Sequence, residues 1–243
     1  DRQLSHRGAA RSVTAMASMM AHEVKNPLSG IRGAAQLLED TVSKDDQSLT
    51  QLIRDEVDRI VALVDRMAMF ADDAPILHQS VNIHQVLDRV LQVSKNGFGR
   101  HSRFVTQFDP SLPPVRGDRD QLVQVFLNLT KNAVEANSDE GAEIVIKTSY
   151  QHGVRFTAPG NGERVHLPLA ISISDNGTGI SDEMMPHLFD PFVTSKPKGS
   201  GLGLALVAKI IGDHGGIVEC ETANTRTVFR VMLPMFQDRK GIK

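Results

Sequence analysis

The sequence predicts an α+β protein, in which an N-terminal antiparallel helical hairpin precedes a mixed β-sheet with helices on one face. Two observations lead to this fold class. From residue 12 to about residue 71, apolar residues recur at steps of three or four, which is the period of an amphipathic helix. Beyond residue 82, helix-like and strand-like stretches are interspersed, as in an α/β layer sandwich.

The first predicted domain consists of two helices joined by the polar link Glu39–Ser48. The apolar stripe of the first helix contains Val13, Met16, Met20, Val24, Leu28, Ile31, Ala35 and Leu38. That of the second contains Leu49, Ile53, Val57, Ile60, Val64 and Met67. Two helices cannot enclose such a seam, so we expect a homodimer in which two hairpins form a four-helix bundle. The alternative is that the hairpin packs on the rest of its own chain.

A linker at Asp72–Asn82 divides the chain into a helical domain, residues 1–76, and a second domain, residues 77–243. In the second domain we expect helices over residues 82–96, 118–137 and 201–215, with Asn82 and Asp118 opening the first two. Strands are expected over residues 103–109, 142–150, 168–175, 216–222 and 227–234. The Gly-rich segment 151–166 is expected to be a long hairpin loop.

Composition excludes several classes of function. There are 27 basic and 29 acidic residues, so the chain lacks the basic excess of a nucleic-acid-binding protein. No apolar run approaches the ~20 residues of a membrane helix, and no signal peptide is visible. We therefore expect a cytoplasmic protein that binds neither nucleic acid nor membrane. The single cysteine, Cys220, is expected to be a buried, inert residue of a strand.

The first chemical motif is the pair Asn128 and Asn132, which lie four residues apart on one predicted helix. Their amides therefore face the same way, and Lys131 lies beside them. Two neutral oxygen ligands and a cation suit Mg²⁺ bound to a polyphosphate, because Mg²⁺ takes few protein ligands besides phosphate oxygens and water. A solvated helix face is the alternative interpretation of this motif alone.

Two glycine-rich motifs follow. Asp175 ends a predicted strand and meets Gly177 and Gly179, an arrangement in which a carboxylate can accept a hydrogen bond from an amino group while the backbone approaches a flat ligand. A set of three glycines opens the last predicted helix, where free N–H groups and the helix dipole favour an anion. This set contains Gly199, Gly201 and Gly203. Taken singly, the two motifs are also compatible with a plain turn and a plain helix start.

In combination the three motifs supply a metal site, an acceptor for an amino group and a phosphate cradle, which are the requirements of ATP. Residues 184–200 lie between the last two motifs and are about the size of a lid. Phe189 and Phe192 can anchor such a lid, and Lys196 and Lys198 can reach phosphates.

Five segments in this order resemble the sensor histidine kinases of two-component systems. They are HEVKNPL (residues 22–28), NLTKNAVEA (128–136), DNGTGI (175–180), DPFVTSK (190–196) and GSGLGL (199–204). The resemblance spans residues 12 to 235 and implies an ATP-binding domain with the fold shared by gyrase and Hsp90. The stretch HEVKNPLSGIRGAAQLLE further resembles the kinases of nitrogen regulation.

The resemblance implies a role for each motif residue. His22 would be the phosphoacceptor, Glu23 would polarise or take the proton of its imidazole, and Asn26 would position a water for dephosphorylation of a partner. Asn128 and Asn132 would hold Mg²⁺. The nucleotide-binding set would comprise Asn128, Lys131, Asn132, Asp175, Gly177, Gly179, Ile180, Phe192, Thr194, Lys196, Gly199, Ser200, Gly201, Leu202, Gly203, Leu204 and Thr227.

The implied function is ATP-dependent autophosphorylation and transfer to an aspartate of an NtrC-like response regulator, with phosphatase activity toward it and a PII-type protein as a possible regulator. Two departures from the family pattern are Arg226 at a glycine place and Glu135 where many members have Lys. One alternative is a nucleotide-gated dimeric scaffold or phosphatase without kinase activity. Another is an ATPase machine of the Hsp90 or gyrase class, which would lack the His-bearing hairpin.

Overall fold

The computed structural model describes residues 23–71, 78–137, 141–151, 155–157, 164–196, 199–223 and 226–237. The chain forms two compact units, Asp1–Ala74 and Pro75–Lys243. The predicted domain boundary after residue 76 falls within residues 72–77, outside the described residues, and it stays a prediction. Also outside them are His22, Lys198 and the start of the first predicted helix.

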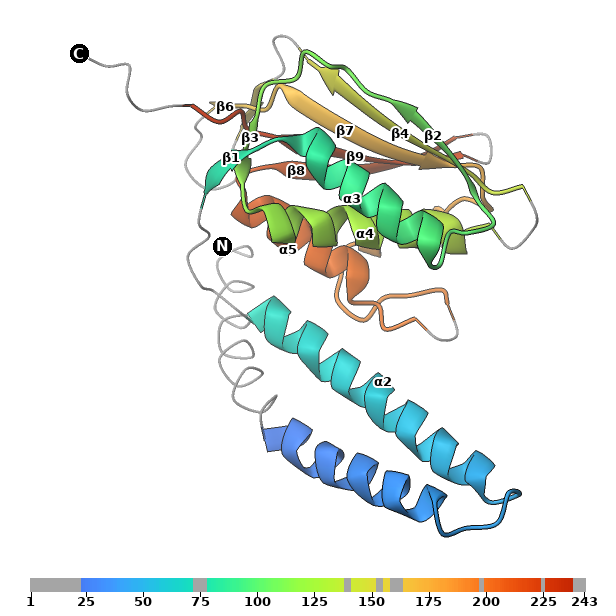
Figure 1. Cartoon of the computed structure of the whole chain (residues 1–243). Coiled ribbons are helices and arrows are strands. Elements are labelled where there is room, and N and C mark those ends of the chain that lie inside the picture. The colour runs from blue at the N-terminus through green and yellow to red at the C-terminus, as the bar shows by residue number, and fades with distance from the viewer. Residues whose placement is uncertain are drawn as a thin grey trace. The chain divides into compact units, whose positions relative to one another are not determined.

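The helical unit is an antiparallel hairpin, as the sequence predicts. Its first helix covers residues 23–39 and is the unlabelled blue helix in Figure 1. Its second is α2, Gln47–Ala71. The register of the two helices follows from ion pairs that cross between them, namely Lys25–Asp65, Arg32–Asp58 and Glu39–Arg54. As residue numbers rise in one helix they fall in the other, so the helices run in opposite directions.

Within one chain the hairpin buries only part of its apolar surface. Leu28, Ala35 and Val57 are buried between the two helices. Large apolar side chains of both helices remain exposed to solvent: Ile31, Leu37, Leu38, Leu49, Leu52, Ile53 and Ile60. Most of these belong to the apolar seam expected from the sequence. The described part of the hairpin therefore leaves much of this seam exposed to solvent.

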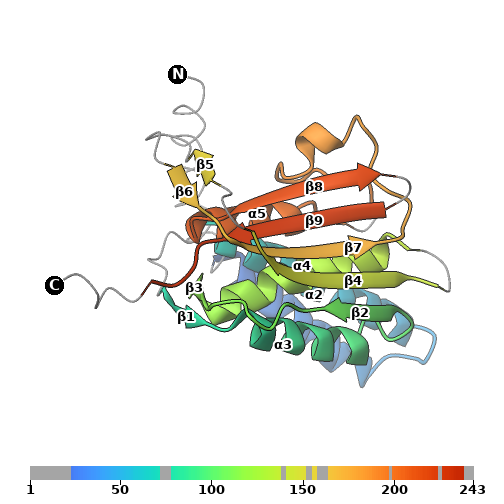
Figure 2. The same cartoon turned by 90° about the horizontal axis from the view of Figure 1, so that it is seen from above.

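The second unit is built on a five-stranded sheet of order β2-β4-β7-β9-β8. Strands β2 (Arg103–Gln107) and β4 (Glu143–Tyr150) are parallel. Strands β7 (Leu169–Asp175), β9 (Arg226–Leu233) and β8 (Ile217–Ala223) complete the sheet, and their pairings are antiparallel. This confirms the predicted mixed sheet, which Figure 2 shows from above.

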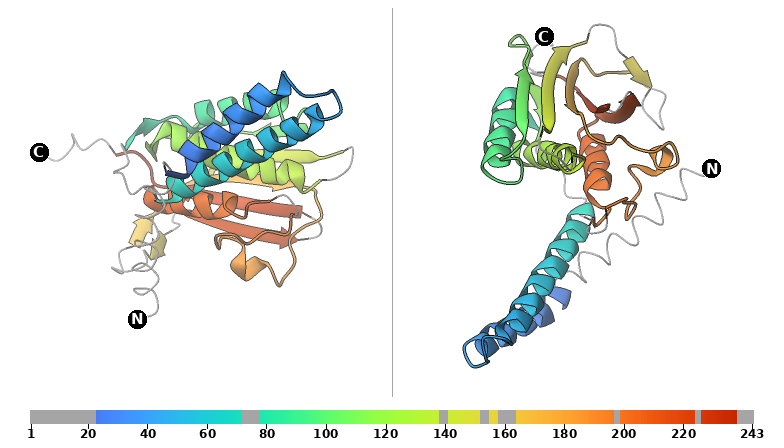
Figure 3. Two further views of the ribbon diagram at one scale, coloured as in Figure 1. Left: turned by 90° about the horizontal axis from the view of Figure 1, so that it is seen from below. Right: turned by 90° about the vertical axis from the view of Figure 1, so that its right-hand side faces the viewer.

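Three helices cover one face of this sheet (Figure 1 and Figure 3). They are α3 (Ile83–Asn96), α4 (Arg119–Glu135) and α5 (Gly203–Asp213). Asn82 and Asp118 cap α3 and α4 through their side chains, as predicted. The apolar faces of the helices and the inner face of the sheet form one core. Its largest fully buried members are Phe126, Ile83, Leu87, Leu122, Leu129, Ile144, Ile146, Leu169, Ile171, Ile173 and Ile211.

Two small strand pairs differ from the sequence prediction. β1 (Gln79–Val81) pairs with β3 (Val115–Gly117). β5 (Arg155–Thr157) pairs with β6 (Arg164–His166) inside the segment expected to be a loop. Each strand has only three residues, too few to show an alternating pattern in the sequence. In the described part of the chain, no helix is long and apolar enough to span a membrane.

Candidate functional site

Asp175 lies at the carboxyl end of β7, and its side chain is only 2% exposed. One carboxylate oxygen accepts a hydrogen bond from the backbone N–H of Gly177 at 2.9 Å. Burial raises the pKa of this carboxyl, and the Gly177 hydrogen bond and the nearby Lys196 charge partly oppose that rise. Thr227, which is also buried, pairs with Asp175 across β7 and β9. A carboxylate and a hydroxyl therefore lie side by side on one face of the sheet.

The turn after Asp175 packs against the end of α4. The N–H of Thr178 donates to the carbonyl of Ala136 at 3.3 Å. A Cβ atom on Gly177 would lie 2.7 Å from that same carbonyl oxygen, so a larger residue does not fit there. Gly179 adopts a φ of +78°, a conformation that favours glycine, and Ile180 packs against the core. The two glycines thus hold the turn close to α4.

Helix α4 brings the predicted metal ligands to this end of the unit. Asn128 and Asn132 lie one turn apart on it, and Lys131 is exposed beside them. The side-chain oxygen of Asn132 accepts a hydrogen bond from the ammonium of Lys196 at 3.2 Å. That ammonium also forms an ion pair with Glu135 at 2.6 Å. The oxygen of Asn132 therefore already faces a positive charge.

The segment before α5 folds back on itself around Gly201. The N–H of Phe192 donates to the carbonyl of Gly201 at 3.0 Å. A Cβ atom on Gly201, whose φ is +65°, would lie 2.4 Å from the carbonyl carbon of Phe192. Phe192 itself has a φ of +68° and is 63% exposed. A positive φ at an aromatic residue is strained, and backbone strain of this kind clusters at functional sites.

A second turn lies just before it. The hydroxyl of Thr194 accepts a hydrogen bond from the N–H of Lys196 at 3.1 Å. A Cβ atom on Gly199 would lie 2.4 Å from that hydroxyl oxygen. The hydroxyl of Ser200 accepts from the N–H of Leu202 at 3.4 Å. Glycine at position 199 is therefore required by the close approach of Thr194.

Helix α5 begins at Gly203 without a side-chain cap, because the preceding residue is the buried Leu202. N–H groups in the first turn of a helix have no partner within the helix, and they bind anions well. A Cβ atom on Gly203 would lie 3.7 Å from the side-chain oxygen of Asn128. The start of α5 and the asparagine face of α4 therefore meet, with Leu204 partly buried behind them.

The residues of this site fit a nucleotide with its magnesium ion. The amide oxygens of Asn128 and Asn132 match the ligand preference of Mg²⁺, and the ammonium beside Asn132 occupies a position where a cation is favourable. The uncapped start of α5 can accept phosphates, and the buried Asp175 can accept a hydrogen bond from an exocyclic amino group. The structure thus brings together the three motifs that lie far apart in the sequence.

The predicted catalytic residues belong to the helical unit. Glu23 and Asn26 are exposed on the helix of residues 23–39, whereas His22 lies outside the described residues. The helix continues through Pro27, which is exposed. The side chains of Glu23 and Asn26 are therefore accessible, as their predicted roles in catalysis would require.

His214 is a structural residue of the site that the motif analysis missed. Its Nδ1–H donates to the carbonyl of Ile210 at 2.7 Å, and its Nε2 accepts from the N–H of Asp118 at 2.9 Å. The ring is 2% exposed, and burial lowers its pKa. It therefore ties the end of α5 to the start of α4, which carries Asn128. The only sign of this structural role in the sequence is that His214 lies at the end of a predicted helix, directly before two glycines.

Cys220 lies in β8, so its predicted position in a strand is confirmed, but it is partly buried rather than buried as expected. Burial nevertheless raises the pKa of its thiol to about 12, with the charges of Asp175 and Glu221 adding to the effect. The thiol is therefore protonated at neutral pH and is a poor nucleophile, as expected.

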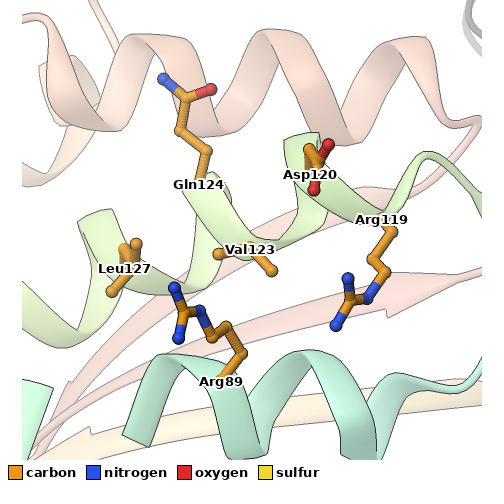
Figure 4. Close-up of a pocket in the computed structure, with 6 residues that line it drawn as sticks. All are labelled: Arg89, Arg119, Asp120, Val123, Gln124 and Leu127. Atoms are coloured by element: carbon orange, nitrogen blue, oxygen red, sulfur yellow. The ribbon is translucent and has the colours of Figure 1, made fainter. Parts of the chain in front are cut away.

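A shallow groove of about 640 Å³ lies between α3 and α4, and Figure 4 shows its lining. Its lining residues are Arg89, Arg119, Asp120, Val123, Gln124 and Leu127. None of them belongs to the site predicted from the sequence. Gln124 and Asp120 lie four and eight residues before Asn128, so they belong to the same row of α4 as Asn128 and Asn132, whereas Arg119, Val123 and Leu127 lie off that row.

Two family models match the chain. Residues 12–73 match the His Kinase A (phospho-acceptor) domain, and residues 117–237 match the histidine kinase-, DNA gyrase B- and HSP90-like ATPase. The chain therefore belongs to the sensor histidine kinases, which confirms the resemblance drawn from its motifs.

The curated relatives include proteins of nitrogen regulation. The sensory histidine kinase/phosphatase NtrB of Azospirillum brasilense is 61% identical over 238 residues, which are 98% of this chain and 60% of the relative. The protein of the same name from Rhizobium meliloti is 60% identical over 96% of this chain and 62% of its own length. That of Escherichia coli O157:H7 is 37% identical over 89% and 60%. The chain thus spans about three fifths of the length of these relatives.

Solved structures share the fold. Full-length ShkA, crystallised with AMPPNP, matches 90% of this chain and 45% of its own with a TM-score of 0.73 at 24% identity. The catalytic domain of the histidine kinase ThkA matches 65% of this chain and 95% of its own, with a TM-score of 0.53 at 26% identity. The mycobacterial sensor histidine kinase MprB matches 65% and 97% with a TM-score of 0.52 at 25% identity.

Proposed function

We propose that this chain is the catalytic core of a sensor histidine kinase that phosphorylates its own His22 with ATP and then phosphorylates an aspartate of a response regulator. The observation that carries the proposal is the meeting of Asp175, the asparagine face of α4 and the uncapped start of α5 at one end of the α/β unit. The match of residues 12–73 to a phospho-acceptor domain supports a histidine nucleophile in the helical unit.

In this proposal Asp175 accepts a hydrogen bond from the amino group of adenine, which favours ATP over GTP, and Thr227 assists through water. Asn128 and Asn132 hold Mg²⁺, while Lys131, Lys196 and the backbone at the start of α5 bind phosphates. The remaining predicted contacts are Gly177, Gly179, Ile180, Phe192, Thr194, Gly199, Ser200, Gly201, Leu202, Gly203 and Leu204. Bound ATP would supply the γ-phosphoryl group, and Mg²⁺ would neutralise part of the negative charge of the phosphates.

His22 is the proposed nucleophile. A histidine with an ordinary pKa of ~6.5 is mostly neutral at pH 7, so Nε2 carries a free electron pair. Nε2 forms the N–P bond while the bond from the γ-phosphorus to the bridging oxygen of ADP breaks, which requires an approach of ~3–3.5 Å. Glu23 orients the Nδ1–H group and stabilises the positive charge on the ring. Asn26 positions a water for the opposing activity, in which water attacks the aspartyl phosphate of the partner and releases inorganic phosphate.

The proposed partners follow from the helical unit and the relatives. The exposed apolar seam of the hairpin supports a homodimer, because a second hairpin would cover it in a four-helix bundle. The NtrB relatives support an NtrC-like receiver domain as the phosphoryl acceptor. A PII-type regulator is also part of the proposal, on the strength of the resemblance of residues 22–39 to the kinases of nitrogen regulation. The NtrB relatives also support phosphatase activity toward the response regulator. We place the protein in the cytoplasm as part of this proposal.

Labelling with γ-³²P-ATP tests the proposal. The wild-type chain is expected to acquire an acid-labile, base-stable label in the presence of Mg²⁺, and His22→Gln is expected to acquire none while binding nucleotide normally. The label is then expected to move to an NtrC-like receiver domain within minutes. An acid-stable label, or a label that persists in His22→Gln, would exclude His22 as the acceptor. Absence of any label despite nucleotide binding would favour the scaffold alternative.

A second variant tests the nucleotide site separately. Asp175→Asn keeps the acceptor oxygen for the Gly177 N–H group but removes a buried negative charge. Because burial raises the pKa of Asp175, the charged form costs stability at pH 7, and the variant should unfold at a higher temperature. It is nonetheless expected to lose most ATP binding by calorimetry, since an amide NH₂ group opposes the amino group of adenine. Unchanged ATP affinity would remove Asp175 from the proposed site.

A further inference from the structure

The ammonium of Lys196 contacts two oxygen atoms on consecutive turns of α4. It lies 3.2 Å from the side-chain oxygen of Asn132 and 2.6 Å from a carboxylate oxygen of Glu135. Lys196 belongs to the segment between the Asp175 turn and α5, so this contact joins two parts of the site that are 61 residues apart in sequence. The two α4 oxygens thus converge on a single positive charge.

The position of this charge bears on the proposed metal site. Asn132 is one of the two proposed ligands of Mg²⁺, and its oxygen points at the ammonium rather than at open space. An ammonium and a divalent cation cannot share one ligand oxygen, because like charges a few ångströms apart repel strongly. Binding of a magnesium nucleotide therefore requires that Lys196 leave Asn132.

We propose that Lys196 is a built-in cation that occupies the metal position of the nucleotide-free domain, with Glu135 as its counterion, and that a magnesium nucleotide replaces it. The inference rests on the proposed function and deepens it. On replacement, the ammonium moves from the oxygen of Asn132 to the phosphates. Glu135, which stands where many members of the family have Lys, becomes the residue that sets how readily this exchange occurs.

The surroundings of Glu135 allow the exchange. The side chains of Lys196 and Glu135 are 36% and 39% exposed, so water screens their attraction and the pair is weak. The second carboxylate oxygen of Glu135 lies 3.7 Å from the ammonium of Lys131 on the same helix. After Lys196 leaves, the ammonium of Lys131, which is also proposed to bind phosphate, still lies near this carboxylate and balances part of its charge. The Glu135–Lys196 pair therefore resists nucleotide entry without preventing it.

Nucleotide affinity in the Glu135→Gln variant gives the first test. Because the substitution removes both the counterion that retains Lys196 and a negative charge near the phosphates, the Kd for MgATP of the full chain should fall by roughly two- to fivefold, the range typical of an exposed ion pair. Isothermal titration calorimetry measures this Kd at low and high salt, and the difference in affinity between the variant and the wild type should shrink in high salt. Weaker binding would mean that Glu135 itself holds the metal, and unchanged binding would mean that the pair is irrelevant; either result overturns the inference.

Metal binding without nucleotide gives the second test. In Lys196→Met the oxygens of Asn132 and Glu135 lose their shared cation, so the nucleotide-free chain should gain Mn²⁺ binding, detected by electron paramagnetic resonance. The double variant Lys196→Met, Glu135→Gln should lose this gain. Lys209→Met is the matched control, because it removes a lysine from a carboxylate of α5, Asp213, that belongs to no part of the proposed site, and it should bind Mn²⁺ as the wild type does.

The two tests separate failure of the inference from failure of the proposed function. Equal Mn²⁺ binding in Lys196→Met and Lys209→Met would overturn the inference even if MgATP binds and His22 is labelled. Conversely, a wild-type chain that binds no MgATP would overturn the proposed function, whereas a Mn²⁺ gain confined to Lys196→Met would still show that the lysine fills a cation position. Circular dichroism of each variant checks that the fold is intact.

Discussion

The two units of the chain differ in how completely each buries its own apolar residues. In the α/β unit, side chains such as Phe126, Leu129 and Ile171 are fully buried in a core closed by the sheet and three helices. In the hairpin, Leu49, Leu52 and Ile53 are between 43% and 61% exposed. Ion pairs at the surface, rather than a closed core, mark the register of its two helices.

This difference indicates what each unit needs to be stable. The α/β unit has a core of its own and is expected to fold alone, since burial of apolar surface is the dominant favourable contribution to folding. Two helices cannot surround an apolar seam, so the hairpin requires a further surface to cover it. The proposed nucleotide site lies in the unit that encloses its own core, whereas the proposed phosphoacceptor lies in the unit that does not.

The largest expected effect comes from placing a charge in the exposed seam. Ile53→Asp should convert the proposed dimer into a monomer with reduced helix content, because burying an unpaired carboxylate in the interface is very costly. Analytical ultracentrifugation and circular dichroism measure both changes. Gln51→Asp is the matched control: it adds the same charge two positions away, on the opposite face of α2, and should leave the dimer intact. A dimeric Ile53→Asp chain would show that the seam is covered in another way.

The next largest effect is expected from a cavity in the core of the α/β unit. Phe126 is 0% exposed, and Phe126→Ala should lower the free energy of unfolding of this unit by about 3 to 5 kcal/mol. Chemical denaturation of the fragment 78–237 measures it, with Val123→Ala, a change at a partly exposed position of the same helix, as the milder comparison. Equal losses in the two variants would contradict the view that this unit owes its stability to a closed core.

A pH effect of intermediate size is expected from His214. Burial lowers its pKa below 6.5, against the opposing hydrogen bonds and the charges of Asp118 and Asp213. The unfolded chain therefore binds the proton more readily, so the free energy of unfolding falls as the pH drops below about 6.5. His214→Gln should be less stable at pH 7, having lost two hydrogen bonds, but should show a shallower loss between pH 7 and 5. His78→Gln is the comparison, because burial and the charge of Arg116 also lower the pKa of this neighbouring histidine. It should flatten the pH dependence by less than His214→Gln, because His78 is only partly buried.

The smallest effect is expected in the hairpin surface. Arg32 and Asp58 form an ion pair at 2.8 Å, with side chains 44% and 55% exposed. Arg32→Gln should lower the helix-unfolding free energy by at most ~1 kcal/mol, and high salt should abolish the difference from the wild type. Thermal melting followed by circular dichroism tests this. A loss as large as that of Phe126→Ala would mean that ion pairs, rather than the seam, hold the hairpin together.

The sequence predicted the elements that carry strong local patterns. The two helices of the hairpin, from residue 23 on, the caps Asn82 and Asp118, and the five long strands were confirmed. The short strands β5 and β6 were missed because three residues are too few to show a pattern. The departure at Glu135 was recognised in the sequence, but its partner Lys196 was not, since the two residues are brought together only by the fold.

The sequence alone determined the family, the order of the motifs and the chemical groups available to the site, because these depend on residue identity and local spacing. Tertiary structure decided which of those groups meet. The contact of Gly203 with Asn128, the tie from His214 to Asp118 and the ammonium of Lys196 on Asn132 all join segments distant in sequence. No local pattern encodes such contacts, since they follow from how helices pack on a sheet.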